Sequence, residues 1–526
     1  MDALDRYRQG VHLAERFRFE EARVALEQAV ALDAGPDALA VLAAVRGELG
    51  DTEGAAHDLE RARELAPDDP AIALLDATLL PMVYRDNADL EHWRARYTER
   101  LDAWVRDGDR YRSQADRILG LARTNFLLAY QGRDDVILQR RLCEGLTTLL
   151  RVALPQYFEP RRRARRSKVR VGFASAYLFD CTVGRYFASW IEELDRDRFE
   201  VVAFMTGTQD DAFTQRLARG CLAMERVNLP VADVAARIVE AELDVLVYPE
   251  VGMDPRCRLL SCLRLAPTQL AGWGHPQTTG SPEIDGFITC GEMEPAGAEA
   301  HYTEPLLRLP GLGVAYEAAP VPPPFTREEL GLEPGRHVYG CPHSLFKLHP
   351  DCDAMFADVL ARDPDGILVL FHAQNTGPVP ARIMGGRFAA ALEKRGVPAR
   401  RQLRFFPRLA ATDFRRALLG MDVVIDPLHW SGGNTALDAL ALGVPLVTAP
   451  GALMRSRQAA AMLRRIDSGE GVAGSPTEAA KMAVDLAGDR SARDALSARL
   501  RANQARLFND SNAVRHLEEH LARRRA

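Results

Sequence analysis

The chain has 526 residues, which is long for one ordinary domain and suits about three or four. Hydrophobic residues make up 47% and charged residues 27%, as in globular proteins with sizeable cores. The formal net charge of -6 argues against nucleic-acid binding driven by overall charge. The eight cysteines form no Cys-x-x-Cys pair, so they suggest neither a zinc site nor a disulfide framework and favour free thiols in a reducing compartment.

The sequence also gives no sign of a membrane partner. At the N-terminus no basic segment is followed by an apolar run, so a signal peptide is not predicted. The most apolar stretch, Ala436–Met454, contains Asp438, Gly443, Pro445 and Pro450, which is typical of a soluble core and not of a membrane span. We therefore expect a cytoplasmic protein without membrane or nucleic-acid partners.

The N-terminal part carries a repeat. The pattern Ala-x3-Leu-x2-Ala begins at Ala22 and returns 33 residues later at Ala55, and Gly10 precedes its first copy. The spacing places the small residues on one helical face, where a neighbouring helix can approach closely. It resembles the tetratricopeptide repeat, whose period is about 34 residues. Repeats of this kind are predicted for residues 1–75, followed by a helical connecting region over 76–160; the alternative is an ordinary pair of alanine-rich hairpins.

After a basic run, Glu159–Lys168, which we interpret as a solvated linker, the periodicity changes. Short apolar or β-branched runs alternate with helical stretches, as in βαβ units. The first series comprises Val169–Ala174, Phe199–Met205, Leu243–Tyr248, Gln269–Trp273 and Ile284–Thr289. After a proline-rich break at 320–324 the second comprises His337–Cys341, Ile367–Phe371, Leu403–Phe406, Val423–Ile425 and Val444–Thr448. Two doubly wound Rossmann-like domains are predicted, at 168–318 and 330–526, with the ligand between them.

The strongest local signal is the segment Asp426–Asp438. A predicted strand ends at its first residue, Gly432 and Gly433 follow, and a helix begins near Thr435. Paired glycines let the backbone approach an anion, and the first-turn N–H groups of a helix point at it, which suits a phosphate or diphosphate. The alternative is a tight turn in which Thr435 and Asp438 form a capping-box-like pair. No Walker A motif is present.

Two further polar residues lie at predicted strand ends. Lys347 follows a strand and precedes a helix that Pro350 can start, so it could balance a diphosphate, although a lone lysine is more often a surface residue. His275 lies between a glycine and a proline after a strand of the first domain and could act as acid, base or hydrogen-bond donor, or only bond to backbone in a turn. Since no acidic pair ends a strand and the histidines are not clustered, no metal site is expected.

The order of these motifs resembles the protein O-GlcNAc transferases and their bacterial relatives, glycosyltransferase family 41. The motifs are Arg170-Val-Gly-Phe-Ala-Ser, Leu265-Ala-Pro-Thr-Gln, Gly-Trp-Gly-His275-Pro-x-Thr-Thr-Gly, Phe346-Lys347, Ser431-Gly-Gly-Asn-Thr and Gly443-Val-Pro-Leu-Val-Thr-x-Pro-Gly451. The resemblance implies an α/β GT-B fold with an acceptor-side domain, 168–318, and a nucleotide-sugar-side domain, 330–526. It implies inverting, metal-independent transfer from a UDP-sugar, most simply UDP-GlcNAc or UDP-glucose, to protein Ser, Thr or Asn side chains, with no other cofactor.

The resemblance also assigns residues. Lys347 would neutralise the diphosphate, and Asp438 would accept from the ribose hydroxyls. The diphosphate oxygens would be held by Ser431, Gly432, Gly433, Asn434 and Thr435. An acceptor protein would bind through the repeats and the helical region.

The position where relatives carry a catalytic histidine is occupied here by Cys181. A thiol does not replace imidazole as a base, although a thiolate could be a nucleophile, so Asp180 or His275 would take the proton. Two other functions stay open: a nucleotide-sugar epimerase, and a non-catalytic repeat scaffold with a degenerate transferase domain.

Overall fold

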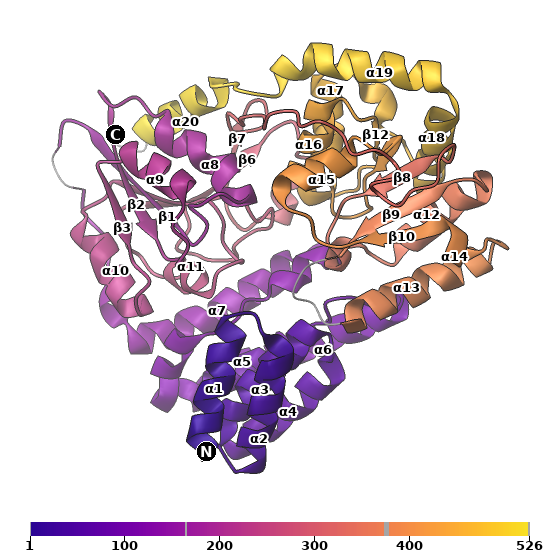
Figure 1. Ribbon diagram of the computed structural model, residues 1–526. Coiled ribbons are helices and arrows are strands. Elements are labelled where there is room, and N and C mark those ends of the chain that lie inside the picture. Colours follow the sequence, from indigo (N-terminus) through magenta and orange to yellow (C-terminus); the bar gives the residue numbers. More distant parts are fainter. Residues whose placement is uncertain (1, 164–165, 373–377, 524–526) are drawn as a thin grey trace.

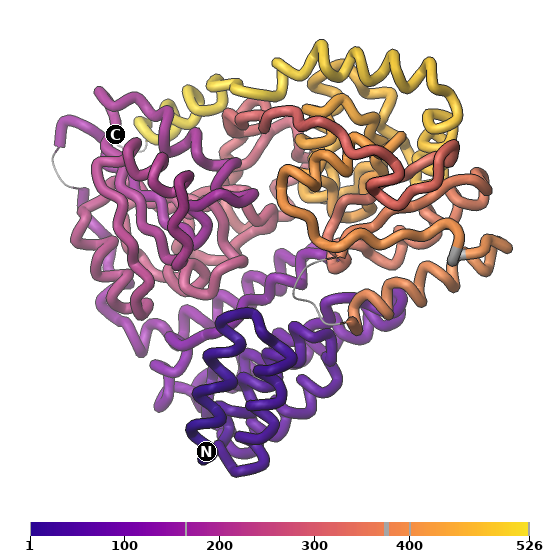
Figure 2. The backbone as a smooth tube through the Cα atoms, in the orientation of Figure 1, coloured from indigo at the N-terminus to yellow at the C-terminus, as the bar shows by residue number. Residues whose placement is uncertain are grey.

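The computed structural model describes residues 2–163, 166–372 and 378–523. A helical N-terminal region, indigo to purple in Figure 1, lies below two α/β domains that stand side by side. The tube in Figure 2 shows how the chain passes through the helical region, then the first α/β domain, then the second.

The repeat region is built of short helices that pack in succession. They are α1 (Ala3–Glu15), α2 (Phe19–Ala31), α3 (Pro36–Leu49), α4 (Thr52–Leu65) and α5 (Pro70–Ala77). Gly10 of α1 allows the first contact, because a Cβ there would stand 2.5 Å from Cγ of Leu26. Ala22 and Ala55, the first residues of the two repeated patterns, are fully buried. The small residues therefore lie at the helix contacts, as the spacing predicted.

The connecting region continues as α6 (Asn87–Arg106), η1 (Arg110–Gly120), η2 (Phe126–Gln131), α7 (Val136–Ala153) and η3 (Pro155–Tyr157). Trp104 of α6 packs where Gly145 of α7 leaves space for its ring. The region forms one continuous hydrophobic core with the first α/β domain. Residues 164–165 of the basic linker lie outside the described part of the chain.

Each α/β domain contains a parallel sheet. The first has the order β3-β2-β1-β4-β5-β6-β7 and the second β10-β9-β8-β11-β12. The strands of the first are β1 (Val169–Ser175), β2 (Phe199–Met205), β3 (Ala223–Arg226), β4 (Val245–Tyr248), β5 (Thr268–Gly272), β6 (Gly286–Cys290) and β7 (Leu306–Leu309). Those of the second are β8 (Val338–Cys341), β9 (Ile367–Phe371), β10 (Leu403–Phe406), β11 (Val423–Ile425) and β12 (Leu446–Val447). The predicted fold class, a GT-B pair behind a helical repeat region, is confirmed.

Helices cover both sheets. In the first domain they are α8 (Thr182–Glu192), α9 (Ala212–Arg219), α10 (Val231–Glu240), α11 (Pro255–Leu260) and η4 (Ala298–His301). From the second sheet onward they are η5 (Leu345–Lys347), α12 (Asp351–Arg362), α13 (Pro378–Glu393), α14 (Ala399–Gln402), α15 (Ala411–Leu418), α16 (Asn434–Leu442), η6 (Met454–Ser456), α17 (Gln458–Arg465), η7 (Gly469–Gly471), α18 (Pro476–Gly488), α19 (Arg490–Asn503), η8 (Gln504–Arg506) and α20 (Asn512–Arg523). Over the described ranges, none of these helices combines the length and the apolarity needed to cross a bilayer.

The last helix returns to the first domain. In Figure 1 α20, in yellow, lies beside α8 and not beside the second sheet. Glu518 of α20 is buried, and its Oε1 accepts a hydrogen bond from the backbone N–H of Asp195 over 2.7 Å. The C-terminal segment therefore joins the two α/β domains on the side opposite the helical region.

Strand order fixes where a ligand can bind. In each sheet the order reverses between the first and fourth strands of its series, β1 and β4 in one domain and β8 and β11 in the other. Loops leaving the carboxyl ends of such strands diverge and leave room for a ligand. The loops that follow β8 and β11 contain Lys347 and the Gly432–Gly433 pair.

Candidate active site

The loop after β11 is fixed by a buried carboxylate. Asp426 accepts hydrogen bonds from the hydroxyl of Ser431 (2.7 Å), the backbone N–H of Gly432 (2.6 Å) and the hydroxyl of Thr448 (2.7 Å). The Ser431 hydroxyl also accepts from the backbone N–H of Ala459. Burial raises the pKa of Asp426 to about 6, although these three donors act against the rise. Ser431 and the Gly432 N–H thus shape the loop, and their own hydrogen-bonding groups are engaged.

The two glycines are required by close contacts. A Cβ on Gly432 would stand 2.7 Å from Oγ1 of Thr435, and one on Gly433 would stand 2.7 Å from Oε1 of Gln458 and 2.8 Å from the hydroxyl of Tyr186. Gly433 is the N-cap of α16, and no side chain caps that terminus. The first-turn N–H groups of α16 are therefore available to an anion, with the helix dipole favouring negative charge.

Asn434 and Asp438 lie on the first turns of α16 and contact each other. The side-chain amide of Asn434 donates to Asp438 over 2.9 Å, and its oxygen accepts from the hydroxyl of Tyr316. Burial raises the pKa of Asp438 to about 6, while Arg415 and Arg185 act in the opposite direction. A hydroxyl-bearing ligand would offset this burial by donating to the carboxylate.

Lys347 supplies the positive charge at the end of β8. Among the described residues no carboxylate acts on its ammonium, and burial is the one influence on its pKa. It lies instead near the rings of Phe346 and Trp430, at 5.9 and 5.7 Å from their centroids. Burial lowers the pKa of Lys347 to about 8, because the charged form is poorly solvated. A cation in such surroundings favours the approach of an anion.

His343, also after β8, lies against the glycine loop. Its Nε2 lies 3.2 Å from Oγ1 of Thr435 and 3.9 Å from Oδ1 of Asp426. Burial and the nearby Lys347 charge lower the pKa of His343 to about 3, so the ring is neutral at neutral pH. A neutral imidazole here orients Thr435 without adding charge.

His275 lies where all three parts of the molecule meet. It is buried and stacks on Phe126 of the helical region, with ring centroids 5.5 Å apart, and lies 6.3 Å from Trp430 of the second α/β domain. Burial, with the charges of Arg258 and Arg455, lowers its pKa to about 3. A group of such low basicity is a weak general base at neutral pH, so the environment suits hydrogen bonding and positioning.

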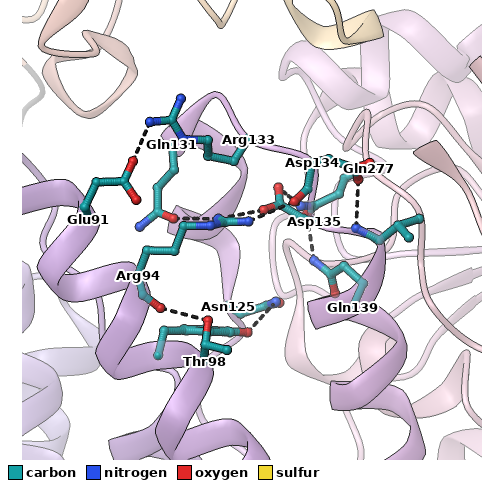
Figure 3. A network of polar contacts seen from close by, with 12 residues as sticks. Glu91, Arg94, Thr98, Asn125, Gln131, Arg133, Asp134, Asp135, Gln139 and Gln277 are labelled. Atoms are coloured by element: carbon teal, nitrogen blue, oxygen red, sulfur yellow. Dashed lines mark hydrogen bonds and ion pairs between the residues drawn. The ribbon is translucent and has the colours of Figure 1, made fainter. Parts of the chain in front are cut away.

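A polar network next to His275 ties the three parts together, and Figure 3 shows its residues in the helical region with Gln277 of the first α/β domain. The buried carboxylate of Asp135 accepts from Arg94 over 2.8 Å and from Gln277 over 2.6 Å, and it pairs with Arg455 at 2.9 Å. Gln277 also accepts from the amide of Gln139 over 2.7 Å. Since Gln277 is in the loop of His275 and Arg455 is in η6, this network fixes the loop between the domains.

Cys181 and Asp180 precede α8 in the first domain. The Cys181 thiol donates to the carbonyl of Tyr177 over 3.5 Å, and burial raises its pKa to about 11. The thiol is therefore protonated at neutral pH, which argues against the nucleophilic thiolate. The carboxylate of Asp180 accepts from Nε of Arg185 over 2.6 Å, and Arg185 in turn acts on Asp438 across the domains.

The sequence analysis did not assign Tyr186. Its buried hydroxyl has no hydrogen-bond partner in the described residues, and it faces the N-cap of α16 at Gly433. The tyrosine comes five residues after Cys181 in the segment Asp-Cys-Thr-Val-Gly-Arg-Tyr. Helical spacing from the N-terminus of α8 could have suggested it, but only the fold brings α8 to α16.

Part of the chain matches a known protein family. Residues 321–517 match the model of glycosyl transferase family 41. The probable UDP-N-acetylglucosamine–peptide N-acetylglucosaminyltransferase SPINDLY of Arabidopsis thaliana is 26% identical over 340 residues, which are 63% of this chain and 36% of the relative. Its namesake in Oryza sativa is 28% identical over 359 residues, 66% of this chain and 38% of the relative. The chain thus spans little more than a third of the length of these curated relatives.

Two further matches are informative. The UDP-glucose:protein N-beta-glucosyltransferase of Actinobacillus pleuropneumoniae is 27% identical over 249 residues, 46% of this chain and 38% of the relative. Among solved structures, a mutant of the Thermobaculum terrenum O-GlcNAc transferase superposes over 100% of this chain and 98% of its own, with a TM-score of 0.74 and 23% identity. At that identity the superposition shows a shared fold.

Proposed function

Because these matches confirm the resemblance to glycosyltransferase family 41, we propose that this chain transfers a sugar from a UDP-sugar, UDP-GlcNAc or UDP-glucose, to protein Ser, Thr or Asn side chains. The observation that carries the proposal is the Lys347 ammonium 5.7 Å from the ring of Trp430, three residues before the uncapped N-terminus of α16, at the strand-order reversal of the second domain. This arrangement suits a diphosphate without a metal ion. In this assignment domain 330–526 binds the nucleotide sugar and domain 168–318 faces the acceptor.

The proposed reaction proceeds by inversion. The acceptor oxygen or nitrogen attacks the anomeric carbon of the sugar while the bond to the diphosphate breaks. Negative charge grows on the leaving diphosphate, where Lys347 and the N–H groups of Gly433, Asn434 and Thr435 stabilise it. Asp438 accepts from the ribose, and the unpaired Tyr186 hydroxyl donates to the donor substrate.

Proton removal from the acceptor falls to Asp180 among the candidates. Cys181 is held as a thiol and His275 is weakly basic, which leaves the carboxylate that Arg185 orients. His275 then positions the acceptor and the aromatic residues around it. The chemistry rests on stabilisation of the leaving group, with the base contributing a smaller factor.

A cavity suits the acceptor chain. It has a volume of about 360 Å³ and runs between the repeat helices and the carboxyl-end loops of both α/β domains. Ala43 and Leu59 line it from the repeats, Phe126 lines it from the connecting helical region, and Tyr177 and Phe346 line it from the two α/β domains. We assign the acceptor segment to this cavity, with the repeats and the connecting helices holding the rest of the acceptor protein.

The test is a thermal-shift titration with UDP. Ligand that binds only the folded chain raises its unfolding temperature. Wild type should show a dose-dependent rise, and Lys347→Ala should lose most of it, since a charged hydrogen bond contributes about 1.5–3 kcal/mol. Lys481→Ala is the matched control, because that lysine is exposed and pairs with Asp485. Absence of any UDP effect on wild type would refute a UDP-sugar transferase.

Turnover separates the alternatives. Transfer of labelled sugar to protein, detected as a mass increase, supports the transferase. Conversion of the UDP-sugar without an acceptor protein would identify an epimerase. UDP binding with no turnover of any kind would indicate a repeat scaffold.

A further inference from the structure

Two histidines that are 80 residues apart in the sequence meet beside the donor site. The rings of His349 and His429 have centroids 4.3 Å apart. Oδ2 of Asp351 lies 2.8 Å from Nε2 of His429 and 3.4 Å from Nδ1 of His349. The sequence argument that the histidines are not clustered is therefore wrong, because the loop after β11 folds onto the start of α12.

We propose that His349, Asp351 and His429 bind a divalent transition-metal ion, for which Zn²⁺ is the natural probe. One nitrogen or oxygen from each residue lies within 4.8 Å of the other two. A tetrahedral zinc with bonds of about 2.0–2.1 Å sets its ligand atoms about 3.3 Å apart, so small side-chain rotations complete the site. Two imidazoles and one carboxylate are a common zinc set, with a fourth position for water.

The two nitrogens of His349 differ in a way that supports a ligand role. Nδ1 accepts from the backbone N–H of Asp351 over 3.1 Å, whereas Nε2 is buried without a hydrogen-bond partner in the described residues. A buried unpaired imidazole nitrogen is costly unless a further group satisfies it. An ion bound at Nε2 would supply such a group, with the ring proton moved to Nδ1, where Oδ2 of Asp351 at 3.4 Å would replace the backbone N–H as its partner.

The backbone of His429 adopts an energetically unfavourable conformation. Its φ is +68°, in the left-handed region that non-glycine residues seldom adopt. Its ring lies against Gly132, where a Cβ would stand 2.7 Å from Cγ of the imidazole. On the other side, Asn87 donates to Oδ1 of Asp351 over 2.8 Å and leaves Oδ2 to the histidines. Contacts from the helical region thus orient two of the three ligands.

The ion would fasten two loops of the donor site. His349 lies two residues after Lys347, and His429 directly precedes Trp430, whose ring is 5.7 Å from the Lys347 ammonium. The cluster contacts Asn87 and Gly132, both in the helical region. Its role would be to hold these loops against the helical region, and this assignment does not depend on the proposed sugar transfer.

The experiment is metal binding by the purified full chain after dialysis against a chelator. With Zn²⁺ we expect one ion per chain by elemental analysis and a rise in unfolding temperature. With Co²⁺ we expect the visible absorption of a tetrahedral site. His429→Asn should lower metal affinity at least tenfold, and asparagine tolerates the left-handed backbone at this position. His349→Gln should do the same.

The matched control is His337→Gln. His337 contacts Asp363 over 2.7 Å, and the other described residue that bonds to the same oxygen is Tyr339 and not a histidine, so its replacement should leave metal binding unchanged. Wild type that takes up no more Zn²⁺ or Co²⁺ than His429→Asn overturns the proposal, and so does full uptake by both cluster variants. UDP titration in parallel distinguishes the outcomes: UDP binding without metal uptake rejects only the metal site, and metal uptake without UDP binding rejects only the transferase.

Discussion

The carboxylate of Asp135 accepts a hydrogen bond from the side-chain amide of Gln277 over 2.6 Å. The first residue belongs to the helical region and the second to the loop that carries His275. Arg455 of the second α/β domain reaches the same carboxylate. One buried charge therefore joins the connecting helical region to both α/β domains.

Asp135→Asn should destabilise the protein strongly. It removes the charge that compensates Arg94 and Arg455, and breaking a buried ion pair costs about 3–5 kcal/mol. We expect a lower denaturant midpoint by circular dichroism. Glu21→Gln, which breaks the exposed pair with Arg18, should leave the denaturant midpoint almost unchanged. Equal small effects of the two substitutions would contradict the role of Asp135.

UDP affinity should fall as pH rises through the pKa of Lys347. Burial lowers that pKa to about 8, so the ammonium is charged below pH 8 and loses its proton above it. Calorimetric titration from pH 7.5 to 9.5 should show weaker UDP binding at the upper end. Lys347→Ala should bind weakly at every pH and lack this step. A wild-type affinity that stays constant to pH 9.5 would argue that Lys347 does not hold the diphosphate.

Tyr186→Phe should separate ligand binding from stability. The hydroxyl is buried and unpaired, so its removal should leave the unfolding temperature unchanged or raise it. If it donates to the donor substrate, UDP-sugar affinity should fall about tenfold, the size of one lost hydrogen bond. Tyr316→Phe is a useful contrast, because its hydroxyl already bonds to Asn434 and its loss should cost stability.

Cys181 should react slowly with alkylating reagents. Burial raises its pKa to about 11, as it does for Cys221 remote from the site. At pH 7.5 mass spectrometry should show similarly slow modification of both thiols by iodoacetamide, because the thiolate is the reactive form. Much faster labelling of Cys181 than of Cys221 would revive the nucleophile hypothesis.

The strands that sequence analysis found are those with mostly apolar runs. Phe199–Met205 and Ile367–Phe371 match β2 and β9 residue for residue, because buried parallel strands require largely apolar sequence. The analysis missed β3 and β7, which are the two edge strands of the first sheet. These strands, Ala223–Arg226 and Leu306–Leu309, are short and partly exposed, so their hydrophobic pattern does not distinguish them from loops.

Sequence analysis could identify three motifs as candidate ligand-binding motifs, those around Lys347, His275 and Gly432–Gly433. Each follows an apolar strand, and parallel strands bring their carboxyl ends together. By contrast, the unpaired hydroxyl of Tyr186 and the His349–His429 pair carry no local signature. They depend on helices and loops that meet only after the domains pack.

The sequence by itself determined the repeat period, the two α/β series and the residue types at the strand ends, because periodicity and glycine placement act over a few residues. Tertiary structure alone decided their electrostatic states and partners. Burial, which no local pattern reports, lowers the pKa of Lys347, keeps the His275 ring neutral and keeps Cys181 a protonated thiol. Desolvation depends on every neighbouring domain at once, and so it belongs to the fold and not to any segment.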